Sequence, residues 1–473
     1  MSQQVQDFQK KNLLSAFEYA VKKEKNFQKV FTYLNLTFPE EDIKNFLIHN
    51  WYLFYEEKKK TELGAYYTPN EIVEWGFQKL KELLKDLSDY VILDPACGCG
   101  SFLFKDWKAK RVIGADLDSV AVEILKTLKF LFDTENIEMF HTNSLKDACR
   151  IKFRIKHDEK LVIVGNPPYN DPTSKNKRAL KEKKSFKDID EDLKKRDIGM
   201  SFFELCVKLK ADAVCFVHPF SYFIKKRNFQ QLKNFFDNYS LKMSLVFSSH
   251  IFHTRRIPFP LAISVFLRDK KGTSWEELQH FAFPIKNTSL YIVPARVETI
   301  DGYIEKYGKK VWESESGLFF FNFRDLNSLI ANGAFSIRTN GSDYIPITKD
   351  NFYKYAYLNS LKNHWEPKEG FSFVFGNFSP LCRKRDLENK DYQSLFIADA
   401  VIHNYLKFSQ FDFKDKNSFI VRSRLVEQIL NTEAWNLKNL FQKWMETNNK
   451  EIAKKICDLV ENYFKKLKKE MLV

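Results

Sequence analysis

The motif Asn166-Pro167-Pro168-Tyr169 carries side chains that suit chemistry on an amino group, and it directly follows the apolar run Leu161–Gly165. Two consecutive prolines fix their φ angles and hold Asn166 extended, which leaves its amide oxygen and the Pro167 carbonyl as acceptors. Two such acceptors would bond the hydrogens of an exocyclic amino group and expose the nitrogen lone pair, while the Tyr169 ring holds the base flat. The motif therefore indicates group transfer to a ring-bound amine, although a turn of this composition also occurs as simple punctuation between elements.

A glycine turn after another apolar run is suited to hold the donor of that group. Asp94 ends the run and is followed by Pro-Ala-Cys-Gly-Cys-Gly, in which Gly98 and Gly100 allow the backbone to approach a ligand closely. We expect this turn to open a helix. Alone it is a weak signal, because many such turns need glycine only for their backbone angles. Leu103 replaces the third glycine of the dinucleotide fingerprint, which disfavours a nicotinamide enzyme.

Two further apolar runs also end in polar residues that could bind the same ligand. Asp116 lies 18 residues after Gly98, where one carboxylate can accept both hydroxyls of a ribose. Asp118 is expected to cap the next helix. Asn143 follows a third run and offers both a donor and an acceptor to an adenine edge.

These motifs come at the ends of short β-branched runs that alternate with helix-length amphipathic segments. The alternation predicts an α/β fold with a doubly wound, mainly parallel sheet of seven strands, whose ligands lie at the carboxyl ends of the strands. The predicted strands are 90–94, 111–116, 137–141, 161–165, 213–218, 243–248 and 262–267, and the predicted helices include 71–87, 120–132, 200–210 and 222–239.

The flanking regions differ from this pattern. Residues 1–60 show helical periodicity, and we predict a second domain over 270–473, of mixed α+β structure, after a central domain at 61–269. Within 270–473, the stretch 339–384 is expected to be loop-rich and partly β, and 432–473 helical. The run 173–197 holds ten Lys/Arg and six Asp/Glu, which indicates a solvated loop or helix, or alternatively a basic flap that closes on phosphates.

The amino-acid composition limits which binding partners and which cellular compartment are plausible. The 473 residues carry a net charge of +15, which favours a polyanionic partner. Seven scattered cysteines do not form a disulfide framework, and the chain shows neither a secretory signal nor a stretch able to span a membrane, so we expect a cytoplasmic protein. We find no His and Cys cluster at metal-ligand spacing and expect no metal.

The order of the motifs resembles the amino-methylating DNA methyltransferases of restriction-modification systems, in their adenine-N6 class. Within this class the chain is similar to the subgroup with the cofactor motif before the catalytic motif and a target-recognition domain at the carboxyl end. The motifs that carry the resemblance are GAYYTP at 64–69, DPACGCGSFL at 94–103, GADLD at 114–118 and NPPY at 166–169.

The resemblance implies a role for each matching residue. S-adenosylmethionine would be held at its methionine part by Tyr67, Thr68, Pro69, Asp94, Ala96, Cys97, Gly98 and Gly100, at its ribose by Asp116, and at its adenine by Asn143, where the family usually has Asp. Asn166, Pro167 and Pro168 would form the catalytic turn, and Tyr169 and Phe252 would stack on a flipped-out adenine. Candidate contacts to the DNA backbone are Lys225, Lys226, Arg227, Arg255, Arg256, Arg383, Lys384 and Arg385.

Double-stranded DNA is thus the expected substrate, with base recognition assigned to residues 270–473. No nuclease motif is recognised, so restriction would need a separate endonuclease as a partner. The same chemistry on cytosine N4, an RNA base or a protein glutamine stays open as an alternative. A DNA-binding module that kept the fold without turnover is a second one.

Overall fold

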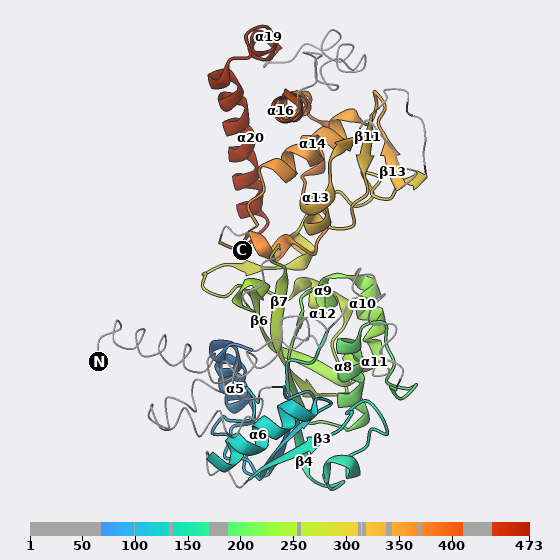
Figure 1. The fold of residues 1–473 in the computed structure, drawn as a ribbon, viewed down its shortest axis with the longest axis vertical. Helices are drawn as coiled ribbons and strands as arrows, with labels where there is room; N and C mark the ends of the chain where they lie inside the picture. Colours follow the sequence, from blue (N-terminus) through green and yellow to red (C-terminus); the bar gives the residue numbers. More distant parts are fainter. Residues whose placement is uncertain are drawn as a thin grey trace, which may run out of the picture. The chain divides into compact units, whose positions relative to one another are not determined.

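The chain forms two units in the computed structural model, which describes residues 68–98, 100–131, 136–169, 188–252, 257–310, 314, 318–336, 343–367, 370–409 and 438–473 (Figure 1). The first unit takes the described residues within Met1–Leu245, Ile251–His253 and Leu261–Leu278, and the second takes the rest. The helical segment predicted at 1–60 lies outside the described residues. In the described ranges, no helix is both long and apolar enough to cross a membrane.

A seven-stranded sheet forms the centre of the first unit and confirms the predicted fold class. Strands β1 to β5 all run parallel to one another, and β7 runs antiparallel to β5. In spatial order the strands are β3 (Ile137–His141), β2 (Arg111–Asp116), β1 (Tyr90–Asp94), β4 (Lys160–Gly165), β5 (Ala213–Pro219), β7 (Pro260–Arg268) and β6 (Tyr239–Ser248).

Helices cover both faces of this sheet, as its doubly wound pattern requires. A Cβ added to Gly76 of α5 would lie 2.8 Å from the Cys215 sulfur of β5, so α5 packs closely on that face. Phe203 of α8 packs against the next residue of the strand, Phe216, with ring centroids 5.3 Å apart. Because successive strand side chains point to opposite faces, α5 and α8 lie on opposite sides. The described helices of the first unit are α5 (Asn70–Leu84), α6 (Ser119–Leu131), α8 (Ile198–Lys208), α9 (Ser221–Ile224), α10 (Lys226–Gln231) and α11 (Lys233–Asn238), and α12 (Trp275–His280) follows β7.

The single helix predicted over 222–239 is wrong, because this segment forms the three short helices α9, α10 and α11. The breaks fall at Lys225, which is extended (φ −108°, ψ 111°), and at Leu232. Tyr222, Leu232 and Phe236 are all buried. In one unbroken helix these apolar side chains and their neighbours would point around most of its circumference, and the breaks let each piece turn its own toward the core.

The second unit combines short antiparallel strands with longer helices. Its four-stranded sheet has the order β10 (Lys309–Lys310), β13 (Asp343–Pro346), β11 (Phe319–Phe321) and β12 (Phe335–Ser336), and a two-stranded ribbon joins β8 (Phe283–Pro284) to β9 (Tyr291–Ile292). The helices are α13 (Leu326–Asn332), α14 (Phe352–Asn363), α15 (Lys384–Glu388), α16 (Lys390–Ser409), α19 (Lys438–Thr447) and α20 (Lys450–Glu470). The architecture is mixed α+β, as predicted, and α19 and α20 confirm the helical end of the chain.

Helix α14 corrects the prediction of a loop-rich, partly β stretch at 339–384. Phe352 and the whole run Tyr355–Leu361 are buried in it. A helix that is covered on nearly all sides has no polar stripe, so its sequence lacks the amphipathic period by which helices are recognised.

Candidate functional site

The predicted site residues of three strands meet at one edge of the sheet. Strand β1 lies between β2 and β4 and is parallel to both, with Asp94 opposite Gly114 and Leu93 opposite Ile163. The carboxyl ends of parallel neighbours lie at the same edge, so Asp94, Asp116 and Asn166 come together there.

The glycine turn after β1 is fixed to the ends of both β2 and β3. The Cys97 N–H donates to the Ala115 carbonyl at 3.0 Å, and the Gly98 N–H donates to Asp116 Oδ2 at 2.8 Å. From the β3 side, the Ser144 hydroxyl donates to the Pro95 carbonyl at 2.6 Å. Gly98 has a positive φ of 46°, and a Cβ there would meet no atom within 4 Å. The turn is therefore held firmly while one side of Gly98 faces open space.

The helix predicted to open at this turn does not form. Residues 101–104 make turns, with the Leu103 N–H donating to the Gly100 carbonyl at 2.8 Å. The Trp107 indole N–H donates a hydrogen bond to the Phe102 carbonyl at 2.7 Å. That carbonyl would accept a backbone N–H if a helix continued, so the buried Trp107 side chain turns the chain toward β2 instead.

Two carboxyl groups, the buried Asp94 and the half-buried Asp116, give the site its electrostatic character. Burial raises the pKa of Asp94 well above its usual value, although the Ala96 N–H donates to Oδ1 at 3.1 Å and lowers it; nearby Asp116 raises it further. Burial also raises the pKa of Asp116, opposed by hydrogen bonds from the Asp118 and Gly98 N–H groups, each 2.8 Å long. Both carboxylates are therefore poorly solvated and would gain from a cationic or hydroxyl-bearing ligand. Asp118 directly precedes α6, and its carbonyl accepts the Val122 N–H, in keeping with the predicted capping position.

Gly165 joins the two halves of the site and was not singled out from the sequence. It ends β4 with φ +146°, and a Cβ there would lie 2.7 Å from Asp94 Oδ1. Only a residue without a side chain leaves room for the Asp94 carboxyl at this point. A glycine just before Asn166, at the end of an apolar run, was the available signal.

The Asn166 side chain ends in a buried carbonyl oxygen, Oδ1, that has no hydrogen-bond partner in the described part of the chain. Such an oxygen is costly unless it accepts a bond in another state of the protein, which marks it as an acceptor for a ligand. The rest of the turn is supported from α8. A Cβ on Gly199 would lie 3.1 Å from the Tyr169 Cβ and 3.4 Å from the Pro168 carbonyl, so the helix start packs directly on the turn.

Gly165→Ala is expected to damage both folding and activity. The added methyl group would clash with the Asp94 carboxyl and place a non-glycine residue at φ +146°, which together should cost about 1–3 kcal/mol in free energy of unfolding. Chemical denaturation of the variant checks this. Gly302→Ala is a matched control with a positive φ of 77° but no atom within 4 Å of the added Cβ. Its free energy of unfolding should fall only by the cost of backbone strain at a positive φ. Equal losses in the two variants would contradict a close contact at Gly165.

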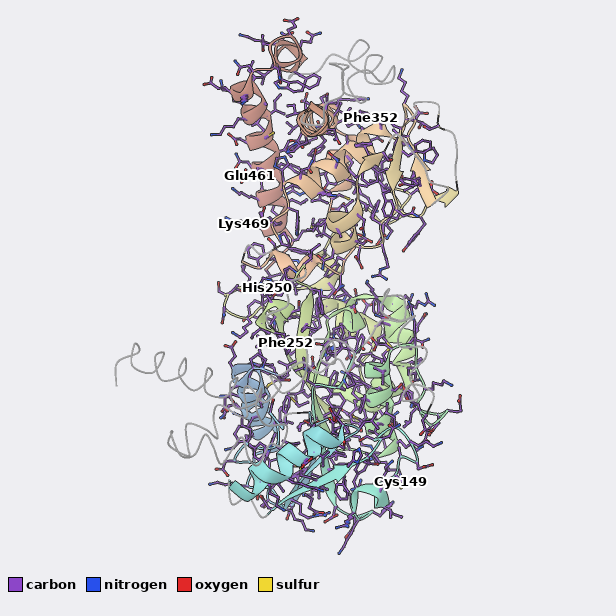
Figure 2. All side chains as sticks on the ribbon, viewed as in Figure 1. Cys149, His250, Phe252, Phe352, Glu461 and Lys469 are labelled. Carbon is purple, nitrogen blue, oxygen red and sulfur yellow. The ribbon has the colours of Figure 1, made fainter. Side chains whose placement is uncertain are left out.

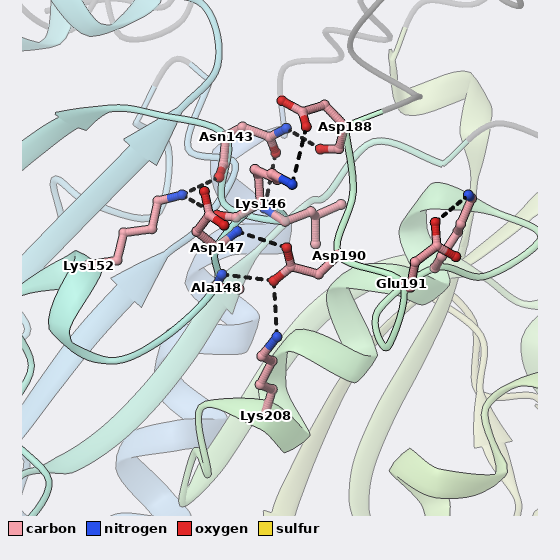
Figure 3. A network of polar contacts seen from close by, with 11 residues as sticks. Asn143, Lys146, Asp147, Ala148, Lys152, Asp188, Asp190, Glu191 and Lys208 are labelled. Atoms are coloured by element: carbon pink, nitrogen blue, oxygen red, sulfur yellow. Dashed lines mark hydrogen bonds and ion pairs between the residues drawn. The ribbon is translucent and has the colours of Figure 1, made fainter.

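Asn143 lies just after β3 in a network with residues 188–190, which belong to the charge run 173–197 (Figure 3). Its Nδ2 donates to the Asp188 carbonyl at 2.7 Å, and its Oδ1 accepts the Leu145 N–H at 3.0 Å. Asp190 accepts the Ala148 N–H at 2.9 Å. An adenine contact of Asn143 stays a prediction, and its Oδ1 would have to make it while keeping the Leu145 bond.

The described part of the charge run, residues 188–197, is a loop with many exposed charged side chains, as predicted, but two apolar residues anchor it; residues 173–187 lie outside the described residues. Ile189 and Leu193 are buried, and Lys208 pairs with Asp190 at 3.0 Å. Burial raises the pKa of Asp190, but the hydrogen bonds from Ala148 and Lys208 outweigh it and lower the pKa to about 2. This segment is thus docked on the domain at neutral pH.

The remaining predicted contacts are distributed over several elements. Thr68 is buried and Pro69 precedes α5, whereas Tyr67 lies outside the described residues. Phe252 ends the short 3-10 helix between β6 and β7, half-buried (Figure 2). The roles assigned to these residues stay predictions.

The three basic clusters differ in their surroundings. Lys226 and Arg227 are exposed and begin α10, shortly after the carboxyl end of β5, and Lys225 precedes them. Arg383 forms ion pairs with Asp386 and Glu470, while Lys384 and Arg385 are exposed. Arg255 and Arg256 lie outside the described residues.

Comparison with known proteins identifies the family. The sequence profile described as "N-6 DNA Methylase" matches residues 42–283, just over half of the chain. The chain belongs to this family. The matched range contains the glycine turn, the Asp116 strand end and the Asn166 turn, so the edge described above lies within the part of the chain that matches the family.

Two individual relatives of this chain are named as methylase subunits of restriction enzymes. The "Type I restriction enzyme MjaVIII methylase subunit" of Methanocaldococcus jannaschii is 28% identical over 156 residues, which are 30% of this chain and 25% of the relative. The MjaVII methylase subunit of the same organism is 30% identical over 132 residues, 26% of this chain and 21% of the relative. The matches thus span about a quarter of each relative's length. A type I restriction-modification methyltransferase subunit from Streptococcus thermophilus has a TM-score of 0.36 and 15% identity, covering 51% of this chain and 53% of that one.

Proposed function

We propose that the chain transfers a methyl group from S-adenosylmethionine to the N6 amino group of adenine in DNA. The observation that carries this proposal is Asn166 Oδ1, a buried acceptor without a partner in the described chain, beside the glycine turn of an N-6 DNA methylase. The exocyclic amine of adenine has two N–H donors, and Asn166 Oδ1 together with the Pro167 carbonyl would accept both. The amine nitrogen then becomes more tetrahedral and its lone pair is exposed for attack.

The residues around Gly98 fit the cofactor. S-adenosylmethionine would supply an electrophilic methyl group on a positively charged sulfur. The open side of Gly98 allows the ligand to lie against the backbone, and the poorly solvated Asp94 carboxylate nearby would attract its positive charge. Asp116, already oriented by two backbone N–H groups, has lone pairs left for the ribose hydroxyls.

The target adenine must leave the double helix to reach Asn166, because its amino group is stacked and paired inside the duplex. Tyr169 follows the acceptors directly and would stack on the extruded base, with Phe252 as the second ring. Unstacking costs a few kcal/mol, which contacts to phosphates would offset.

Lys225, Lys226 and Arg227 are the proposed phosphate contacts, because they follow the carboxyl end of β5, next to the Asn166 strand. Changing all three to Gln should weaken DNA binding and lower the slope of log affinity against log salt by about 2–3. Fluorescence anisotropy with a labelled duplex, at several salt concentrations, measures this slope. The matched control changes Lys79, Lys108 and Lys194 to Gln, which removes the same charge elsewhere on the first unit. An equal drop in both triple variants would argue against a local contact.

We further propose that this methylation is the modification activity of a restriction-modification system, carried out in the cytoplasm. The curated relatives are named as methylase subunits of type I restriction enzymes, which supports a separate endonuclease as partner. The free state of all six described cysteines supports a reducing compartment. Residues 270–473 would read the DNA sequence.

The deciding experiment expresses the chain in a host that lacks adenine methylation and maps modified bases across the genome. N6-methyladenine in one recurrent sequence, absent with Asn166→Ala, is the expected result. Recurrent N4-methylcytosine would replace adenine by cytosine as the target. Without any modified DNA, labelled cofactor is offered to purified chain with DNA, RNA and protein extracts, and transfer only to RNA or protein would overturn the DNA assignment. A chain that binds no cofactor would be a binding module alone.

A further inference from the structure

Four side chains with metal-binding atoms meet inside the second unit, far along the chain from the Asn166 motif. His364 follows α14 directly, Asp399 and His403 lie one turn apart on α16, and Cys457 lies on α20. One ligand atom from each of the four lies within 4.8 Å of the others. Three separate helices thus bring two imidazoles, a carboxylate and a thiol to one point.

Asp399 is the buried centre of this group. Its side chain is 0% exposed, and Oδ1 lies 2.8 Å from His364 Nε2 and 3.2 Å from His403 Nδ1. Its second oxygen, Oδ2, is buried and has no hydrogen-bond partner in the described part of the chain. Placing a carboxylate in the protein interior with one oxygen unsatisfied is costly. A cation bound beside it would remove that cost.

A His-Asp-His hydrogen-bond cluster explains only part of this arrangement. It uses Oδ1 of Asp399 and two rings, and the Cys457 thiol also approaches this carboxylate, but Oδ2 is left without a hydrogen-bond partner in the described part of the chain. Cys457 comes from α20, 54 residues beyond His403, yet its sulfur lies with the other ligand atoms. A fourth donor of a different chemical kind points to a metal rather than to a charge pair.

The donor set selects the kind of metal. Calcium and magnesium prefer oxygen ligands only, whereas zinc is held in tetrahedral sites by sulfur, nitrogen and carboxylate oxygen. Four protein ligands fill such a site and leave no open position for substrate, which is the pattern of a structural site. Zn²⁺ with one thiolate and one carboxylate is electrically neutral, which suits an interior position.

We propose that His364, Asp399, His403 and Cys457 bind one Zn²⁺ ion that clamps α14, α16 and α20 together. On binding, the Cys457 thiol loses its proton to solvent and the sulfur bonds to the metal, while both imidazoles bind in their neutral form. The ion thereby ties the C-terminal helix to the interior of the second unit. This inference is independent of methyl transfer, since the four residues lie in none of its motifs.

The test uses the full chain, stripped of metal and reloaded with Zn²⁺ or Co²⁺ alone. We expect about one zinc per chain by elemental analysis, and a cobalt form with tetrahedral visible bands and a thiolate-to-cobalt band in the near ultraviolet. Cys457→Ala should lose the thiolate band and bind zinc at least roughly tenfold more weakly. Cys149→Ala removes an exposed thiol of the first unit and should change neither (Figure 2).

Stability gives a second readout that does not depend on purifying every variant. Zinc should raise the thermal midpoint of the metal-free wild-type chain by roughly 5 °C or more, and a chelator should reverse it. A refolded wild-type chain that takes up less than about 0.2 zinc per molecule, or whose cobalt spectrum lacks the thiolate band, would overturn the proposal. So would a thiolate band that persists in Cys457→Ala.

Discussion

Asn166→Ala should reduce methyl transfer to DNA by at least roughly 10²–10³-fold, the loss typical of removing one group that stabilises a transition state. The reason is the buried Asn166 Oδ1, the acceptor that has no partner in the described chain. Single-turnover transfer from labelled cofactor to a duplex measures the chemical step. Because the side chain does not belong to the glycine turn, cofactor affinity by thermal shift should stay within about twofold.

Asn238→Ala is the matched control for this experiment. Asn238 lies at the end of α11 in the same unit, and its side-chain amide donates to the Asn234 carbonyl at the surface. It should retain full transfer. If Asn166→Ala also retained it, the amino group would be activated elsewhere. If Asn166→Ala lost cofactor binding too, Asn166 would support the fold of the site rather than the reaction.

Asp94→Asn should change stability and activity in opposite directions. Burial raises the pKa of Asp94 well above 3.8, so the folded chain binds more protons than the unfolded chain between these two values. Stability is therefore lost as the pH rises through this window, because the charged form is disfavoured in the fold. Asn keeps the acceptor for the Ala96 N–H and carries no charge. At pH 7 the variant should be more stable by about 1–3 kcal/mol.

The same change should weaken cofactor binding by at least roughly tenfold, since the positive charge of the cofactor loses its buried partner. Denaturant unfolding from pH 3.5 to 7.5 measures the stability difference, and calorimetric titration measures binding. The gap in stability should be small at the acid end and open as the pH rises. Parallel pH profiles in the two proteins would show that the pKa of Asp94 is the same in the folded and the unfolded chain, which would contradict a shift caused by burial.

The strands of the first unit could be predicted because each is a short β-branched run between polar turns. Three predicted strands, 90–94, 111–116 and 137–141, match β1, β2 and β3 at both ends. The ends of helices were harder to predict from the sequence, since a helix can end at one residue with a non-helical backbone angle. The predicted 71–87 ends three residues early, at Leu84, because Lys85 adopts φ +61°. The expected helix after Gly100 failed for a tertiary reason, the Trp107 side chain bond to the Phe102 carbonyl.

The candidate site could be predicted from the sequence only where its residues form continuous motifs. Asp94, Asp116 and Asn166 were predicted from runs that end in polar residues, and the sheet brings them to one edge. The role of Gly165 could not be seen, because the atom that requires it belongs to Asp94, more than 70 residues earlier. Asp399 and the three residues around it could not be recognised as a cluster for the same reason: apart from the pair on α16, no spacing along the chain relates them.

The contact between Gly165 and Asp94 links the glycine turn after β1 to the turn after β4, so the two turns must fit each other in evolution. Position 165 cannot gain a side chain alone, because the carboxyl group at 94 occupies the space that a Cβ at 165 would need. Chimaeras that exchange the glycine turn between members of this family should work only when the residue before Asn166 is exchanged with it. Homologous sequences should accordingly show these two positions changing together.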